Sequence, residues 1–221
     1  MEGLVEGADG RCRCAWGAST ADYVAYHDEE WGRPVGSDAR LLEKLCLEGF
    51  QSGLSWLTIL RKRAAFRAAF AEFDASTLAQ WGPTDVERLL TDAGIVRHRG
   101  KIEAVLTNAR ATLAVQRSHG SLAAFVWAFE PPPEELPPRM DLATLRSRAT
   151  TPASLRLSKA LKRAGFTFVG PTTAQAFQQA MGMVDDHLDG CWVRAEVERE
   201  RATFVRPEVP SDPGGGSNQR R

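Results

Sequence analysis

Apolar residues recur at helical spacing through most of the chain. Between residues 38 and 48, Leu41, Leu42 and Leu45 fall on one face of a helix. Comparable amphipathic patterns predict further helices over residues 54–70, 100–118, 121–129, 154–164 and 171–181. Because no segment alternates convincingly between apolar and polar residues, we expect an all-α fold.

Several residue types mark where these helices start and stop. Thr84 followed by Glu87 has the spacing of a capping box, and Gly94 suits the C-terminal cap of the same helix. Pro171 suits a first helical turn. The proline-rich segment 130–140 suits neither a helix interior nor a central strand, so it is predicted to be a surface loop.

The two ends of the chain differ in composition from its middle. Residues 1–11 are rich in glycine and acidic residues, and residues 206–221 are rich in proline, glycine and serine. Such segments bury too little apolar surface to fold, so both ends are predicted to be disordered. A single helical domain then spans residues 12–205, which is long enough to bury a core.

Charge and composition exclude several classes of protein. The 28 Lys and Arg residues balance 28 Asp and Glu residues, so any affinity for nucleic acid must come from local clusters of charge. The chain has no long apolar run and no signal peptide, which predicts a cytoplasmic protein without membrane contact. Its 4 cysteines are too few and too scattered for a disulfide scaffold, so metal binding is the better hypothesis for them.

One cysteine and one histidine come from each end of the predicted domain, namely Cys14 with His27 and His187 with Cys191. The short gap in the second pair is typical of structural zinc sites. Four such ligands would fill a tetrahedral Zn²⁺ and leave no place for an activated water, so one structural ion per chain would join the two ends. Cys12 could replace Cys14, and a satisfied histidine beside a buried free cysteine would explain the spacing equally well.

Residues 155–181 form a predicted helix, tight turn and second helix, with Gly165 closing the first helix. This stretch resembles the helix-hairpin-helix element of base-excision DNA glycosylases. Backbone N–H groups in such a turn can bind phosphate oxygens without reading sequence. We therefore predict that Val169, Gly170 and the nearby Lys162 bind DNA phosphates.

Three further strings complete a family pattern: DYVAYHDEEWG at 22–32, CLEGFQSGLSW at 46–56 and DAGIVRHRGKIEAV at 92–105. With the metal ligands and VDDHLDGC at 184–191, they resemble the bacterial 3-methyladenine DNA glycosylase I family over about residues 14–191. The resemblance implies a compact helix-hairpin-helix glycosylase fold with a structural zinc. It also implies hydrolysis of the N-glycosidic bond of 3-methyladenine in alkylated double-stranded DNA, and we expect a monomer.

An alkylated base must leave the stack to be excised, and its pocket needs aromatic walls with a few polar groups. Tyr26, Trp56, Trp16 and Tyr23 can supply such walls. Glu48 ends an apolar helix face, where an unpaired carboxylate would be costly. The resemblance assigns stacking to Tyr26 and Trp56, and it assigns hydrogen bonding of the adenine edge, with support of catalysis, to Glu48. A cationic base between aromatic rings gains roughly 0.5 to 2 kcal/mol.

Two positions bear on the mechanism that the resemblance implies. Thr172 stands where strand-cleaving members of the superfamily have a lysine nucleophile, so a monofunctional enzyme is predicted. Asp185 occupies the place of the superfamily's catalytic carboxylate, although the 3-methyladenine-specific family commonly has asparagine there. Asp185 is therefore a tentative catalytic residue, and the alternative is that it caps or orients the chain beside His187.

Two other functions fit parts of the pattern. One is a hairpin DNA-binding module that has kept the zinc and lost catalysis. The other is a small-molecule metallohydrolase, in which His27, His187 and Asp186 leave a zinc position open to water. The two cysteines disfavour this second function.

Overall fold

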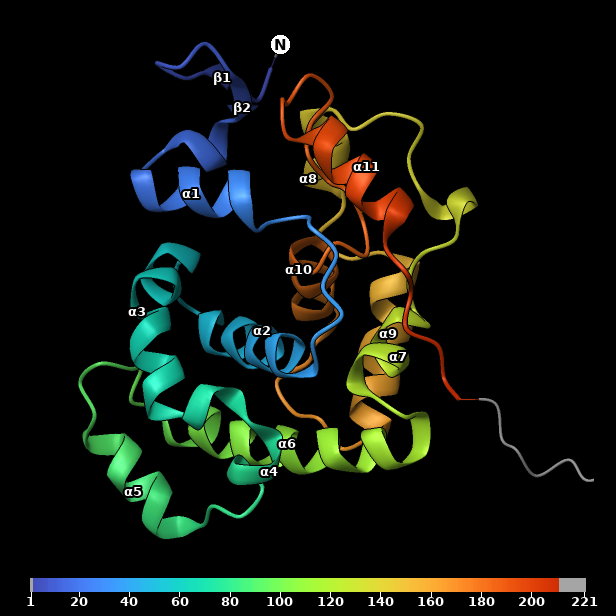
Figure 1. The fold of residues 1–221 in the computed structure, drawn as a ribbon. Coiled ribbons are helices and arrows are strands. Elements are labelled where there is room, and N and C mark those ends of the chain that lie inside the picture. The colour runs from blue at the N-terminus through green and yellow to red at the C-terminus, as the bar shows by residue number, and fades with distance from the viewer. Residues whose placement is uncertain (1, 211–221) are drawn as a thin grey trace, which may run out of the picture.

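The computed structural model describes residues 2–210, and helices make up most of them (Figure 1). The helices are α1 (Ala21–Glu29), α2 (Asp38–Gln51), α3 (Trp56–Ala69), α4 (Ala75–Leu78), α5 (Pro83–Thr91), α6 (Arg99–His119), α7 (Leu122–Trp127), α8 (Leu142–Ser147), α9 (Pro152–Arg163), α10 (Pro171–Ala180) and α11 (Arg194–Thr203). Short 3₁₀ turns are η1 (Ala15–Ala18), η2 (Ala71–Phe73) and η3 (Pro133–Glu135). Within residues 2–210, every helix is too short or too polar to cross a lipid bilayer. The predicted helical fold class is confirmed.

A short antiparallel hairpin at the N-terminus departs from the all-helical prediction. Its strands are β1 (Leu4–Glu6) and β2 (Cys12–Cys14), with Leu4 opposite Cys14. Arg13 is buried and binds the carboxylates of Asp9 and Asp28, which fixes the hairpin against α1. The prediction that residues 1–11 are disordered is therefore wrong for residues 2–11. Strands of three residues are too short to show an alternating pattern, and the glycine-rich composition hid the turn.

The C-terminal segment is tied to the domain as far as the structure describes it. Arg206 donates hydrogen bonds of 2.9 Å to both carboxylate oxygens of Glu130. The predicted tail of 206–221 therefore begins with an anchored residue. Residues 211–221 of that prediction lie outside the described residues.

The start and end of α5 differ from the predicted capping signals. Gly82 is the N-cap, and its N–H donates to Asp85 Oδ2 at 3.1 Å, because Pro83 occupies the first helical position. The prediction that Thr84 and Glu87 form a capping box is therefore wrong. The helix ends at Thr91 with Asp92 as its C-cap, so Gly94 is not the cap either.

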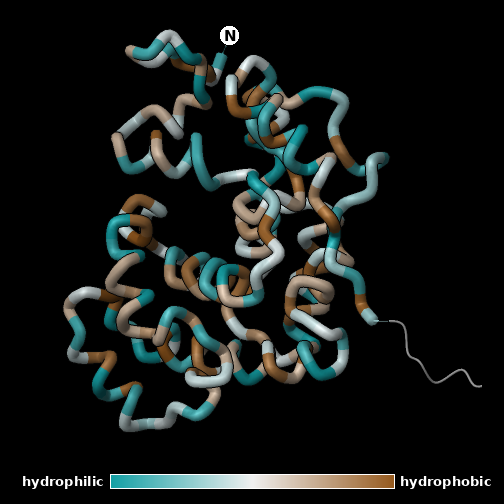
Figure 2. The backbone as a smooth tube through the Cα atoms, viewed as in Figure 1, coloured by the Kyte–Doolittle hydropathy of each residue, from teal (hydrophilic) through white to brown (hydrophobic). Residues whose placement is uncertain are grey.

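Helix α2 lies at the centre of the fold, against α3, α6, α7 and α10 (Figure 1). Its buried Phe50 packs on Phe66 and Phe70 of the α3 segment, with ring centroids 4.6 and 6.0 Å apart. Apolar and polar positions interchange along the helices in Figure 2, as expected for helices that bury one face. Helix α2 is anchored in this core, and its residues Glu48 and Gln51 line a pocket together with residues of α1 and α10.

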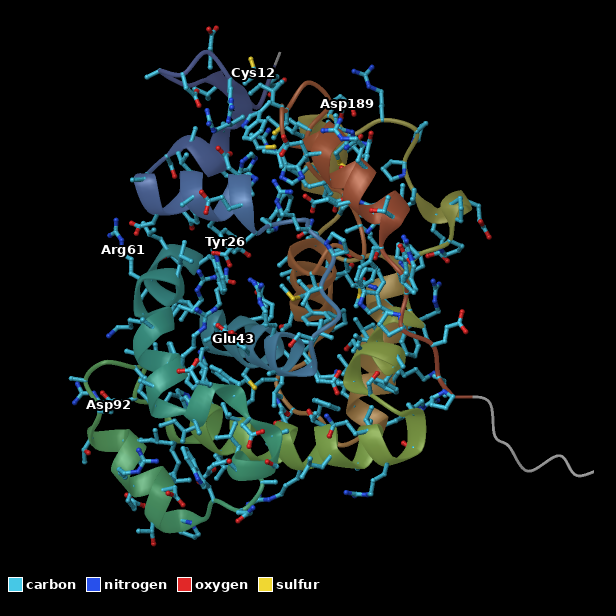
Figure 3. All side chains as sticks on the ribbon, viewed as in Figure 1. Cys12, Tyr26, Glu43, Arg61, Asp92 and Asp189 are labelled. Atoms are coloured by element: carbon cyan, nitrogen blue, oxygen red, sulfur yellow. The ribbon has the colours of Figure 1, made fainter. Side chains whose placement is uncertain are left out.

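A second, smaller core joins the two ends of the domain. It contains Cys14 of β2 together with Met140, Leu188, Cys191, Val193 and Val197. Cys12 and Asp189, labelled in Figure 3, lie at this same end of the molecule. The N-terminal hairpin and the segment before α11 are thus packed together.

Candidate active site and metal centre

The smaller core contains a cluster of possible metal ligands. The ligand atoms of Cys14, His27 and Cys191 lie within 4.8 Å of one another, and all three residues are buried. The hydrogen bond from Cys14 lowers the pKa of the Cys191 thiol, which favours the thiolate that metals bind. Cys12 is exposed and stands outside the cluster. The structure thus brings together three of the four predicted ligands, taken from both ends of the domain.

His187, the fourth predicted ligand, lies beside this cluster. Its ring centroid is 4.9 Å from that of His27. Its Nδ1 atom is 2.8 Å from Asp185 Oδ1, and its Nε2 atom is buried without a hydrogen-bond partner among the described residues. A buried ring nitrogen without a hydrogen-bond partner beside His27 is suited to act as a metal ligand.

Carboxylates orient both histidines. His27 Nδ1 lies 2.8 Å from Asp28 Oδ1, and Arg13 holds Asp28 in turn at 2.8 Å. Asp185 plays the same part for His187. Histidine ligands of metals commonly donate their second nitrogen to a carboxylate in this way, so each Nε2 is the atom left for an ion.

Asp186 points into a different environment. Its Oδ2 atom accepts a 2.8 Å hydrogen bond from Gln179, and Arg148 lies at 3.5 Å. Asp186 is not part of the Cys14, His27 and Cys191 cluster. The structure therefore gives no support to the metallohydrolase alternative, which needed Asp186 as a ligand.

A pocket of about 230 Å³ opens between η1, α1, α2, α3 and α10. The predicted base-binding residues all line it: Trp16, Tyr23, Tyr26, Glu48 and Trp56. The rings form a continuous wall, with Trp16 and Tyr23 at 5.8 Å and Tyr26 and Trp56 at 5.5 Å between centroids. Figure 3 labels Tyr26 between α1 and α2. The sequence interpretation thus selected residues that meet in space.

Local capping and one long-range hydrogen bond hold these walls in place. The side chain of Ser55 caps α3 by accepting from Thr58 N–H at 3.2 Å, which sets Trp56 in the first turn. The N–H of Leu57 donates to Tyr23 Oη at 3.1 Å and thereby joins α3 to α1. The pocket walls are therefore anchored by elements that pack on the main core.

Lys44 also lines this pocket, and the sequence interpretation missed it. Its Nζ atom lies 2.7 Å from Glu48 Oε1 and 2.8 Å from Tyr26 Oη. The same atom lies 3.3 Å from the ring centroid of Trp56. Burial lowers the pKa of Lys44, and the charge of Glu48 opposes that effect. The signal was the four-residue spacing of Lys44 and Glu48 on one helix, which places both on the same face.

A second hollow of about 280 Å³ adjoins the pocket and shares Glu48 and Gln51 with it. Leu54 lines this hollow and is 43% exposed. Thr172 of α10, which the sequence resemblance placed at the position of the lysine nucleophile in strand-cleaving enzymes, also lines it. The exposed apolar side chain of Leu54 beside the base pocket is a second feature that the sequence interpretation did not identify.

The hairpin between α9 and α10 has an open turn. Ser158 donates a 2.6 Å hydrogen bond to the carbonyl of buried Val169. Gly170 is the N-cap of α10, makes no side-chain cap and has open space where a Cβ would stand. Lys162 is exposed nearby on α9. Because α10 also carries Thr172 and Ala176, its N-terminus and the second hollow lie on one helix.

Asp185 lies outside the base pocket. Its Oδ1 atom accepts from the backbone N–H of His187 at 3.1 Å as well as facing that ring. This placement favours the orienting alternative for Asp185 over direct contact with a substrate.

Comparison with known proteins agrees with these features. The family model for methyladenine glycosylases matches residues 16–195. The chain is 48% identical to DNA-3-methyladenine glycosylase 1 of Escherichia coli, over 81% of this chain and 95% of that protein. It is 44% identical to the DNA-3-methyladenine glycosylase of Haemophilus influenzae, over 81% and 96%. The solved 3-methyladenine DNA glycosylase I of Staphylococcus aureus is 36% identical and has a TM-score of 0.76, over 82% of this chain and 96% of that one.

The family model covers most of the chain, and the relatives align with almost their full length. The resemblance inferred from the motifs is thereby confirmed. The chain belongs to the methyladenine glycosylase family.

Proposed function

We propose that the protein is a monofunctional DNA glycosylase that hydrolyses the N-glycosidic bond of 3-methyladenine in alkylated double-stranded DNA. The observation that carries the proposal is the pocket in which four aromatic side chains surround the carboxylate of Glu48. Flat aromatic walls and a carboxylate that can accept hydrogen bonds suit a flipped purine base. The names of the Escherichia coli and Haemophilus influenzae relatives support the same substrate.

In this reaction the bond between the base nitrogen and C1′ of the sugar breaks, and its electron pair goes to the base. The methylated base thereby loses its positive charge and leaves neutral. Water adds its oxygen to C1′ and gives up a proton. Because the leaving group is already activated, the protein can work by selective binding and by support of charge on the sugar, without a strong general acid.

We assign distinct parts of this work to the pocket residues. Tyr26 and Trp56 stack on the base, with Trp16 and Tyr23 completing the walls. Glu48 hydrogen-bonds the edge of the base through the carboxylate oxygen that Lys44 does not hold. Thr172 offers no amine, so no Schiff base forms with the sugar.

We propose that Cys14, His27, His187 and Cys191 hold one structural Zn²⁺. The two thiols, two imidazoles and carboxylate partners fit the preferences of this ion. When bound, the ion would cross-link the N-terminal hairpin to the segment before α11. Asp185 then acts as a positioning residue for His187.

We propose that Val169, Gly170 and Lys162 bind DNA phosphates at the open N-terminus of α10. Leu54, exposed at the mouth of the pocket, is suited to enter the stack where the flipped base has left. The residues of the pocket and of the metal cluster all come from this one chain, which supports our proposal of a monomer.

The test is the detection of free 3-methyladenine after incubation with methylated duplex DNA. A protein that binds this DNA and releases no base would be the DNA-binding module instead.

A further inference from the structure

Two buried polar side chains of α6 bind the backbone of other elements. Lys101 and Asn108 are 8% and 1% exposed, and they lie two helical turns apart on the same face of α6. Helix α6 packs against α2 (Figure 1). Neither side chain lines the base pocket or belongs to the metal cluster. Because burial of a polar group is costly unless it is paired, the partners of these two side chains indicate what they do.

Lys101 holds the end of α2 and the loop that follows it. Its Nζ atom donates to the carbonyl of Phe50 at 2.9 Å and to the carbonyl of Ser52 at 2.6 Å. The last carbonyls of a helix lack partners within the helix and form the negative end of its dipole, so an ammonium suits them. Burial lowers the pKa of Lys101, and no carboxylate among residues 2–210 opposes that effect. The two carbonyls are therefore what stabilises the buried charge.

The loop that Lys101 holds is the one that presents Leu54. It is a tight turn between α2 and α3, in which the N–H of Leu54 donates to the carbonyl of Gln51 at 2.6 Å. Gly53 has a φ of 81° and allows the chain to turn there. Ser52 lies inside this turn, so the bond from Lys101 to its carbonyl fixes the position from which Leu54 projects.

Asn108 holds the hairpin turn between α9 and α10. Its Oδ1 atom accepts from the N–H of Thr167 at 2.8 Å, and its Nδ2 atom donates to the carbonyl of the same residue at 3.3 Å. The next residue, Phe168, has a φ of 55°, which a bulky side chain adopts only where neighbouring contacts hold it. Asn108 on one side and the bond from Ser158 to Val169 on the other therefore fix the turn.

The loop and the hairpin border the same hollow. It is lined from both sides, by Gly53 and Leu54 of the loop and by Thr172 and Thr173 in the first turn of α10. DNA resists bending, so a protein that binds phosphates at one element and inserts an apolar side chain from another must hold the two at a fixed spacing. Helix α6 bonds to both elements.

We propose that Lys101 and Asn108 are positioning residues that hold the Leu54 loop and the hairpin turn at the spacing that DNA requires. The inference rests on the proposed function, in which Leu54 enters the base stack and the hairpin binds phosphates. Because neither residue touches the base, their contribution goes to bringing the damaged base out of the duplex. Misplacement of a positioning element by about 1 Å can cost roughly a hundredfold in rate.

The experiment separates the steps that need DNA from the binding of the base. Lys101→Met and Asn108→Ala should each lower the single-turnover excision of 3-methyladenine from methylated duplex DNA by roughly tenfold to a hundredfold. Calorimetry should show that both variants bind free 3-methyladenine as tightly as the parent does, because the base pocket is unchanged.

Arg110→Met is the matched control. Arg110 is also a cation on α6 that donates to two backbone carbonyls, those of Ala79 at 3.0 Å and Trp81 at 2.6 Å. These residues lie outside the hollow and the base pocket. This variant should therefore keep both the excision rate and the affinity for the free base.

Combined variants show which element each residue acts through. Leu54→Ala should cost little further excision once Lys101→Met is present, and Lys162→Ala should cost little further affinity for duplex DNA once Asn108→Ala is present. Changes that act through one element are not additive, whereas those at independent sites are. Melting temperatures show which variants are folded, and Lys101→Gln or Asn108→Ser replaces a variant that is unfolded at the assay temperature.

Additive losses in either cycle would overturn the inference for the residue that the cycle tests. An equal loss of excision in Arg110→Met, or a parallel loss of affinity for free 3-methyladenine, would overturn it for both. Release of 3-methyladenine by a parent whose cycles are additive contradicts only the role of α6. A parent that releases no 3-methyladenine contradicts the proposed function itself.

Discussion

His187 Nδ1 lies 2.8 Å from Asp185 Oδ1, and the opposite ring nitrogen is buried without a hydrogen-bond partner among residues 2–210, in a ring whose centroid lies 4.9 Å from that of His27. The contact fixes the ring with Nε2 free, as a metal ligand requires. The position that suggested a catalytic carboxylate in the sequence thus contacts a proposed metal ligand in the structure.

We expect Asp185→Asn to lower the excision of 3-methyladenine by about tenfold or less, near 1.4 kcal/mol. The melting temperature and the retention of metal should fall, because the amide holds His187 less firmly. Single-turnover kinetics with saturating enzyme, together with thermal melting, make the comparison. A loss of roughly a thousandfold in a folded variant would instead show that a carboxylate takes part in the reaction.

The purified protein should contain one zinc ion per chain. Elemental analysis measures this directly, and Cys191→Ser should lower both the zinc content and the melting temperature. Cys12→Ser is the matched control, because Cys12 is exposed and lies outside the cluster. Equal stability of the parent and the Cys191→Ser variant would contradict a structural ion.

Glu48→Gln should preserve the fold and weaken both excision and the binding of free 3-methyladenine. The amide loses the charge and presents a mismatched donor, so we expect a loss of roughly 1 to 3 kcal/mol. Glu43→Gln is the control, since Glu43 lies on the same helix and pairs with Arg67 outside the base pocket. If Glu48→Gln binds free 3-methyladenine as well as the parent does, the role of Glu48 is structural.

Lys162→Ala should weaken the binding of duplex DNA without changing any preference among sequences. If Lys162 contacts one phosphate, the slope of log affinity against log salt should decrease by about 0.9. Arg156→Ala is the comparison, because Arg156 lies on the same helix and is paired with Glu135 at 2.7 Å. Identical salt slopes for the parent and Lys162→Ala would remove Lys162 from the phosphate site.

The sequence predicted the long helices because each buries one apolar face, and α2, α6, α9 and α10 lie within a few residues of their predicted bounds. It failed at the N-terminal hairpin, whose strands of three residues depend on contacts with α1 rather than on their own pattern. It also failed at α5, where proline at the first helical position decided the start.

The aromatic walls were selected through the family resemblance, and the metal ligands through their residue types together with that resemblance; the structure brings the aromatic residues into one pocket and three of the four ligands into one cluster. Lys44 was not predicted as a pocket residue, because a lysine on a helix is normally solvated. Only the packing of α1 and α3 shows that this lysine is buried. The relation of Asp185 to His187 was one of two alternatives, because the sequence alone does not show which way a carboxylate points.

The most direct test of the account is the chromatographic measurement of free bases released from methylated and deaminated duplex DNA. 3-Methyladenine, 7-methylguanine and hypoxanthine are quantified separately, and strand integrity is checked before any treatment with alkali. We expect 3-methyladenine as the principal product, with abasic sites in unbroken strands. Absence of 3-methyladenine, or strand cleavage that accompanies its release, would contradict a monofunctional 3-methyladenine glycosylase.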